Sequence, residues 1–284
     1  AARWARGRMA PKKRPAAAGS VVGAPRKRPA AAAADPAVQF ACPPAVDGPM
    51  VVLEAAKPRP MTLPLKSTAL LCIDFQKDFL DEGGFGHALG NNVTALVEDC
   101  IPGAEILLAA AREGGRLPAV VHTKEAHRPD LSDCPACKLD GPRAAPDGKR
   151  IGQELVEGHG RLLVHGSPCN EFVDRAKPLD TEKVVCKPGK GAFFATDLHE
   201  YLRSKGVSHL IVCGVTTEVC VQTTMREAND RGYECVLVED ATSSYIPEFK
   251  ETVIRMVSSQ GGIVGYTVST AQSVADALRA ASPA

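Results

Sequence analysis

The sequence is organised around Val207–Val238, VSHLIVCGVTTEVCVQTTMREANDRGYECVLV. The apolar run Leu210–Cys213 is short and rich in β-branched side chains, which favours a buried strand. Residues 219–230 carry apolar or small side chains at helical spacing, and Gly232 is placed to end that helix. A second apolar run, Cys235–Val238, follows. The stretch therefore predicts a strand–helix–strand unit whose two strands are parallel.

Cys220 lies just past the carboxyl end of the first strand of this unit, where a helix is expected to begin. Helix-terminal N–H groups and the helix macrodipole stabilise a thiolate at such a place. We therefore expect the pKa of Cys220 to fall below the free-thiol value of about 8.5. A cysteine in this position is suited to act as a nucleophile.

Alternating strand-like and helix-like segments continue outward from this unit over residues 65–284. They predict one α/β domain with a three-layer, doubly wound, mostly parallel sheet of about six strands and helices on both faces. Further strands are expected at 68–75, 118–122, 161–164, 183–187 and 262–265, and helices at 91–112, 196–205, 247–258 and 271–281. In the first of these helices Asn91-Asn92 is the expected cap, Pro102 is expected to kink or split it, and Gly114-Gly115 to stop it.

The charge of the chain is distributed unevenly. Residues 1–34 contain nine basic side chains and no acidic one, and the rest has 25 basic and 33 acidic residues, a net charge of −8. An acidic domain is a poor partner for nucleic acid, so no nucleic-acid binding is expected of it. No run of 18 apolar residues and no secretory leader occurs, so we expect no membrane partner.

Residues 1–64 are predicted to form a disordered basic Ala/Pro-rich arm followed by a linker or N-terminal strap at 35–64. Three interpretations of the arm stay open: an organellar transit peptide, a nuclear-import or RNA-binding arm, and a tail of biased composition without a role. Met9 is a candidate initiator. A cytoplasmic location, with organellar import through the arm as the alternative, agrees with the cysteine pattern described next.

Ten cysteines are present, and four of them, Cys72, Cys186, Cys213 and Cys235, fall within apolar strand-like runs. Free cysteine behaves as a small buried hydrophobe, so core packing in a reducing compartment is the expected role of these four. The pair Cys134 and Cys137 forms a lone CxxC, which is either redox-active or a chance feature of a loop. No second pair follows at zinc-ligand spacing.

Three reactive side chains are expected at the carboxyl ends of the parallel strands, where ligands bind in open α/β sheets. They are Asp74 after the first strand, Lys187 after the third and Cys220 after the fourth. A cysteine nucleophile needs a base, and a carboxylate beside a lysine can serve. Backbone N–H groups of residues 214–217 and of Cys220 are candidate oxyanion donors. The predicted reaction is acyl transfer to water through a thioester.

These residues also carry a resemblance to a family. The segments Asp74-Phe75-Gln76 with Phe79, Lys187–Phe193 and Gly214–Val221 resemble the motifs of the isochorismatase-like cysteine hydrolases. Four longer segments resemble the biuret hydrolase branch: His122–Asp133, Lys187–Leu198, Thr223–Ala241 and Ser259–Gly265. The resemblance runs from about Ser67 to Leu278.

The resemblance implies a role for each matching residue. Asp74 would be the general base, Lys187 would orient it, and Cys220 would be the nucleophile. A cis peptide would join Val215 and Thr216, which places the N–H groups of Thr216 and Cys220 in the oxyanion hole. The substrate-binding positions would be Gln260, Phe79 and Lys190. The implied substrate is biuret or a similar small ureide, the implied assembly is a homo-oligomer (dimer or tetramer), and no cofactor and no metal is expected.

Two alternatives to this function remain at this stage. The same triad could act on ureidoacrylate, triuret or an N-carbamoyl compound. A non-catalytic binding protein that uses the basic arm is the alternative from a different class.

The polar excursion His127–His159 is the expected lid or subunit contact, because loops of that length in compact domains are usually functional.

Overall fold

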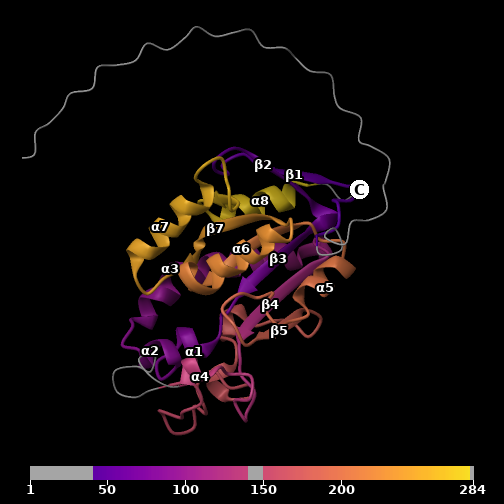
Figure 1. Cartoon of the computed structure of the whole chain (residues 1–284). Helices are drawn as coiled ribbons and strands as arrows, with labels where there is room; N and C mark the ends of the chain where they lie inside the picture. Colours follow the sequence, from indigo (N-terminus) through magenta and orange to yellow (C-terminus); the bar gives the residue numbers. More distant parts are fainter. Residues whose placement is uncertain (1–40, 140–149, 282–284) are drawn as a thin grey trace, which may run out of the picture. The chain divides into compact units, whose positions relative to one another are not determined.

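Strand β6 (His209–Val215), the first strand of the central unit, lies inside a six-stranded sheet of order β5-β4-β3-β6-β7-β8 (Figure 1). The structure is a computed structural model that describes residues 41–139 and 150–281. The expected arm at 1–34 and the segment Asp140–Gly148 lie outside these residues. Every pairing in the sheet is parallel. Its other strands are β3 (Thr68–Ile73), β4 (Ala119–Glu125), β5 (Lys183–Lys187), β7 (Glu234–Ser243) and β8 (Tyr266–Val268).

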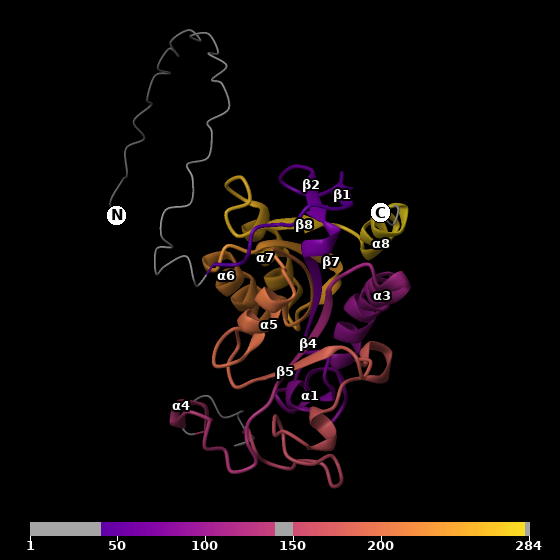
Figure 2. The same cartoon turned by 90° about the vertical axis from the view of Figure 1, so that its right-hand side faces the viewer.

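Helices cover both faces of the sheet (Figure 2), which confirms the predicted three-layer α/β fold. Alternate side chains of each strand point to opposite faces, and two separate apolar clusters result. Leu70 and Val236 pack on the face covered by α3 and α8, whereas Leu71 and Leu237 pack on the face covered by α5, α6 and α7. The helices are α1 (Lys77–Leu80), α2 (Phe85–Ala88), α3 (Val93–Arg112), α4 (Ala136–Leu139), α5 (Leu198–Ser204), α6 (Gln222–Asp230), α7 (Pro247–Ser258) and α8 (Ala271–Ala280).

Helix α3 begins as predicted and is not split. The Asn92 side chain accepts a hydrogen bond from the Ala95 N–H at 3.2 Å, which satisfies one of the free N–H groups of the first turn. Pro102 lies inside one continuous helix of 20 residues. The expected break is absent from α3 because the helix is anchored against β7 and α8 on both sides of the proline, and this packing compensates for one missing backbone hydrogen bond.

Replacing Asn92 by alanine is expected to lower the free energy of unfolding by about 1 kcal/mol, because the cap of α3 is lost without any change in the core. Urea denaturation of the purified protein measures this. A matched change at the exposed Gln272, whose amide bonds only Asp276 within α8, should change the stability by less than half as much. Equal stabilities of Asn92→Ala and the parent protein would contradict the assignment of the cap.

An antiparallel hairpin precedes the sheet, in residues predicted to be a linker or an N-terminal strap. Strands β1 (Met50–Leu53) and β2 (Met61–Pro64) pair with Met50 opposite Pro64. The domain boundary expected at residue 65 is therefore too late. Prolines of the connection between the strands suggested a linker, but Val51 and Leu63 alternate with exposed neighbours and are buried in the same apolar cluster as α8.

Two shorter strand predictions and one burial prediction were also wrong. The last strand is Tyr266–Val268 instead of 262–265, because Gly262 and Gly265 have φ angles of 84° and 156° that belong to a turn. Residues 161–164 form no strand; Val164 makes a single bridge to His127. Cys186 is exposed while the other three strand cysteines are buried, because β5 is the edge strand of the sheet.

Candidate active site

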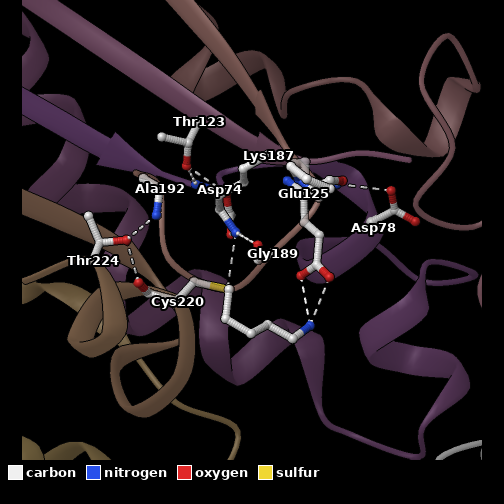
Figure 3. A network of polar contacts seen from close by, with 12 residues as sticks. Asp74, Asp78, Thr123, Glu125, Lys187, Gly189, Ala192, Cys220 and Thr224 are labelled. Carbon is white, nitrogen blue, oxygen red and sulfur yellow. Dashed lines mark hydrogen bonds and ion pairs between the residues drawn. The ribbon is translucent and has the colours of Figure 1, made fainter. Parts of the chain in front are cut away.

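The structure brings Asp74, Lys187 and Cys220 together at the carboxyl edge of the sheet, as the sequence predicted (Figure 3). Asp74 follows β3, Lys187 is the last residue of β5, and Cys220 belongs to a π-helical turn at Thr217–Val221 that follows β6. Asp74 and Lys187 are fully buried and Cys220 is 3% exposed. Water therefore has little access to these groups, so the charges interact more strongly than they would in solvent.

The Lys187 ammonium group is the centre of this cluster. Its Nζ lies 2.8 Å from Asp74 Oδ2 and donates hydrogen bonds to the Gly189 carbonyl oxygen at 3.1 Å and to Cys220 Sγ at 3.4 Å. Burial by itself would lower the pKa of Lys187, but Asp74, Cys220 and Glu125 together outweigh burial and hold that pKa above its ordinary value. Lys187 is thus a permanent cation that links the carboxylate to the thiol.

Asp74 is held in place by its neighbour on β4. The Thr123 hydroxyl donates to Asp74 Oδ1 at 2.6 Å, and the Asp74 N–H donates to the Thr123 carbonyl oxygen at 3.1 Å. Asp74 has a φ of 54°, so the chain turns sharply as it leaves β3. Oδ2 accepts no hydrogen bond of good geometry from the described residues and has only the ion contact with Lys187. That oxygen can receive a proton.

The predicted lowering of the Cys220 pKa was wrong. Burial raises the pKa of the Cys220 thiol above its ordinary value, and Lys187 opposes this only in part. Cys220 is the fourth residue of its helical turn, and its thiol lies inside the core, where loss of water outweighs the effect of the helix start. The resting thiol is therefore protonated, and it needs a base before it can attack.

The turn between β6 and Cys220 has a backbone that only a few residues can adopt. Gly214 has a φ of 128°, and a Cβ there would overlap the Ile73 carbonyl oxygen. The peptide bond between Val215 and Thr216 is cis, as the family resemblance implied. The Thr224 hydroxyl donates to the Cys220 carbonyl oxygen at 2.7 Å, which ties this turn to the first turns of α6.

A second charged group, missed in the sequence, lies beside the first. β4 extends three residues beyond the expected end, to Glu125, which pairs in register with Lys187. Glu125 is fully buried, and its two carboxylate oxygens lie 2.9 and 2.8 Å from Lys190 Nζ. The continuation of β-compatible residues from His122 to Glu125 and the strand register were the signals that could have found it.

Of the three expected substrate-binding residues, the structure brings Lys190 close to the triad, and Phe79 lies in α1, which begins three residues after Asp74. Phe79, in α1, is 7% exposed, and its carbonyl oxygen accepts a hydrogen bond from the Tyr245 hydroxyl at 2.7 Å. The Lys190 side chain is 41% exposed above Glu125. Both residues belong to segments that follow the carboxyl ends of strands β3 and β5.

Gln260 is not brought to the triad within this chain. It is exposed in the connection between α7 and β8. Helix α7 returns to the amino edge of the sheet before β8 begins, and Gly265 in the same connection packs against the Cys235 carbonyl oxygen near the start of β7. The structure therefore gives Gln260 no contact with the triad of the same chain, and its role in binding substrate stays a prediction.

Comparisons with known proteins agree with this geometry. The isochorismatase domain family matches residues 68–272. The chain belongs to the isochorismatase family. The ureidoacrylate amidohydrolase RutB of Yersinia enterocolitica is 30% identical to it over 201 residues, which cover 69% of this chain and 84% of that protein.

Two solved structures of the isochorismatase type have the same fold. A cysteine hydrolase from Pseudomonas syringae pv. phaseolicola superimposes with a TM-score of 0.62 at 24% identity, over 78% of this chain and 96% of that one. An isochorismatase family protein from Desulfovibrio vulgaris gives a TM-score of 0.58 at 29% identity, over 75% and 98%. The part of this chain that the isochorismatase family model matches, residues 68–272, contains Asp74, Lys187 and Cys220 and leaves out the hairpin β1–β2.

Proposed function

We propose that this isochorismatase family hydrolase is a cysteine-dependent amidohydrolase that cleaves a C–N bond of biuret or a similar small ureide. The observation that carries the proposal is the hydrogen bond from Lys187 to Cys220 Sγ together with the 2.8 Å contact of the same ammonium group with Asp74. A nucleophile, a base and a fixed cation then occupy one water-poor site.

In the proposed first half-reaction, Asp74 Oδ2 takes the proton of the Cys220 thiol as sulfur attacks the amide carbonyl carbon. The oxygen becomes an oxyanion, for which the N–H groups of Thr216 and Cys220 are the proposed donors. The C–N bond then breaks, Asp74 returns its proton to the leaving nitrogen, and ammonia departs from a thioester.

In the second half-reaction a water molecule gives its proton to Asp74 and adds to the thioester carbonyl. The C–S bond breaks, and the proton returns from Asp74 to sulfur. The products are a carboxylic acid and the regenerated thiol, so the net reaction is amide plus water to acid plus ammonia. Lys187 remains protonated throughout, because its raised pKa opposes proton loss at neutral pH.

The substrate is the part of the proposal that needs a direct test. Phe79 offers an apolar wall and Lys190 an ammonium donor for a planar ureide. The alternative substrates are ureidoacrylate, triuret and N-carbamoyl compounds, and the RutB relatives favour keeping ureidoacrylate among them. We expect ammonia release to be fastest with biuret when these compounds are compared at equal concentration. Faster ammonia release from ureidoacrylate than from biuret would mean that ureidoacrylate is the substrate instead of biuret.

The remaining proposals concern the membrane, the oligomeric state, the cellular location and the basic arm. None of the helices within 41–139 and 150–281 combines the length and the apolar character needed to cross a membrane. We propose a homo-oligomer in the cytoplasm with a small amide as its only ligand. The non-catalytic alternative depends on the basic arm, so a truncated chain that begins at residue 41 and retains full ammonia release would contradict it.

A further inference from the structure

We infer that the site discriminates against substrates that carry a carboxylate, because the lysines at the site are offset by an equal number of carboxylates and Glu125 neutralises the most exposed lysine. Glu125 is then a specificity-determining residue. The inference rests on the proposed function and names the substrate class that the site accepts: an uncharged ureide rich in N–H groups.

Each cation beside the nucleophile has an anionic partner. Lys187 contacts Asp74 Oδ2 at 2.8 Å, and both groups are fully buried. Lys190 is bound by both oxygens of Glu125, at 2.9 and 2.8 Å, which uses two of its three N–H groups. One N–H of Lys190 is left to donate to a ligand, and the positive charge of Lys190 is compensated by the Glu125 carboxylate.

The position of Glu125 is fixed by its backbone. Its N–H donates to Gln76 Oε1 at 2.8 Å, and its carbonyl oxygen accepts hydrogen bonds from Gln76 Nε2 at 3.1 Å and from Asn170 Nδ2 at 2.9 Å. All three residues are fully buried. Gln76 and Asn170 bond only the Glu125 backbone, which fixes the strand end and leaves the carboxylate free to contact Lys190. Figure 3 shows Glu125 beside Lys187 and Asp78.

The next layer of charged groups does not change this balance. Lys138, from α4, lies 3.5 Å from Glu125 Oε1 and donates to the Pro188 carbonyl oxygen at 2.6 Å. Asp78 is fully buried, and burial raises its pKa to about 6, so it is mostly ionised at neutral pH. His127, which also faces Glu125, has a pKa lowered by burial and adds no positive charge. Lys138 thus shares Glu125 with Lys190, and Asp78, which shares the Gln76 amide with the Glu125 backbone, adds the third carboxylate to a site with three lysines.

Glu218 adds a further negative charge two residues before the nucleophile. Its Oε2 is buried and accepts no hydrogen bond from the residues the structure describes. Burial, Cys220 and Glu218 together raise the pKa of Tyr245, so the Glu218 carboxylate and the Cys220 sulfur act on the same hydroxyl group. The Glu218 charge adds to the repulsion that a substrate carboxylate would meet near Cys220.

Two alkylating reagents of nearly equal size test the inference without any turnover. Iodoacetamide is neutral and iodoacetate is an anion, and mass spectrometry measures the labelling rate of Cys220 with each reagent at one mildly alkaline pH. The ratio of the iodoacetamide rate to the iodoacetate rate is expected to be about tenfold larger for Cys220 than for N-acetylcysteine. A ratio equal to that of N-acetylcysteine would overturn the inference.

Glu125→Gln keeps the shape and removes the charge. It is expected to bring the ratio to within about twofold of N-acetylcysteine, because Lys190 then attracts the anion. Glu105→Gln is the matched control, since Glu105 bonds Arg175 in an exposed ion pair on α3 and should leave the ratio unchanged. Equal effects of Glu125→Gln on both labelling rates would reveal a merely structural role and contradict the inference.

Lys190→Met provides the opposite change if Glu125→Gln does not fold. Lys190 is partly exposed, and its loss leaves the Glu125 charge less compensated, so the ratio is expected to rise above that of the parent protein. A lower ratio would overturn the inference. A failure of the proposed function can be told apart from a failure of this inference. The first would appear as no ammonia release from any ureide, whereas the labelling ratio decides the charge preference without turnover.

Discussion

Replacing Cys220 by alanine is expected to reduce ammonia release from the preferred ureide by about 10⁴-fold or more, because the variant can form no thioester. The neighbouring Asp74 and Lys187 would stay paired at 2.8 Å, so the loss would not come from unfolding. Steady-state ammonia release and far-ultraviolet circular dichroism of the same preparations measure both properties. Cys186→Ala is the matched control, because Cys186 is exposed on the edge strand and its loss should leave activity unchanged.

The reactivity of Cys220 should also depend on pH in a definite direction. The pKa of this thiol is raised by burial, so its thiolate fraction at neutral pH is smaller than that of a free cysteine. Its alkylation by iodoacetamide without substrate is therefore expected to continue rising above pH 10, where an ordinary thiol with a pKa of about 8.5 has reached its plateau. Labelling that is complete at pH 7 would contradict the buried, protonated resting state. Ammonia release retained by Cys220→Ala would contradict the mechanism.

Replacing Lys187 by methionine is expected to have the second largest effect, on stability as well as activity. The change leaves the Asp74 carboxylate buried without its cation, which costs about 3–5 kcal/mol of the free energy of unfolding. The folded-state pKa of Lys187 is raised, so its stabilising contribution is complete below the unfolded value of about 10.4 and declines only at higher pH. Urea denaturation at pH 7 therefore measures the full loss.

The double variant Asp74→Asn with Lys187→Met separates stability from catalysis. It removes both charges, so most of the lost stability is expected to return, whereas ammonia release should remain abolished. The Thr123 hydroxyl can still donate to the asparagine carbonyl oxygen, which keeps the local structure. Equal stability of Lys187→Met and the parent protein would show that the buried pair does not contribute as described.

The sequence by itself determined the parallel α/β fold and the meeting of three reactive residues. Apolar runs of strand length, such as Leu210–Cys213, alternate with helical patterns, and strands joined by helices are parallel. Since parallel strands end at one edge, the sequence predicted Asp74, Lys187 and Cys220 at that edge, and the strand order then brings them into contact. These conclusions depend on local patterns and topology, which a single sequence contains.

Only the tertiary structure decided the properties that depend on burial and on distant neighbours. The pKa of Cys220 is raised because the whole core excludes water from the thiol, an effect that helix position alone does not contain. The pairing of Glu125 with Lys190 joins residues 65 positions apart, and the exposed position of Gln260 follows from the path of α7. Charge balance in the site is a sum over many elements, and it exists only when they are packed together.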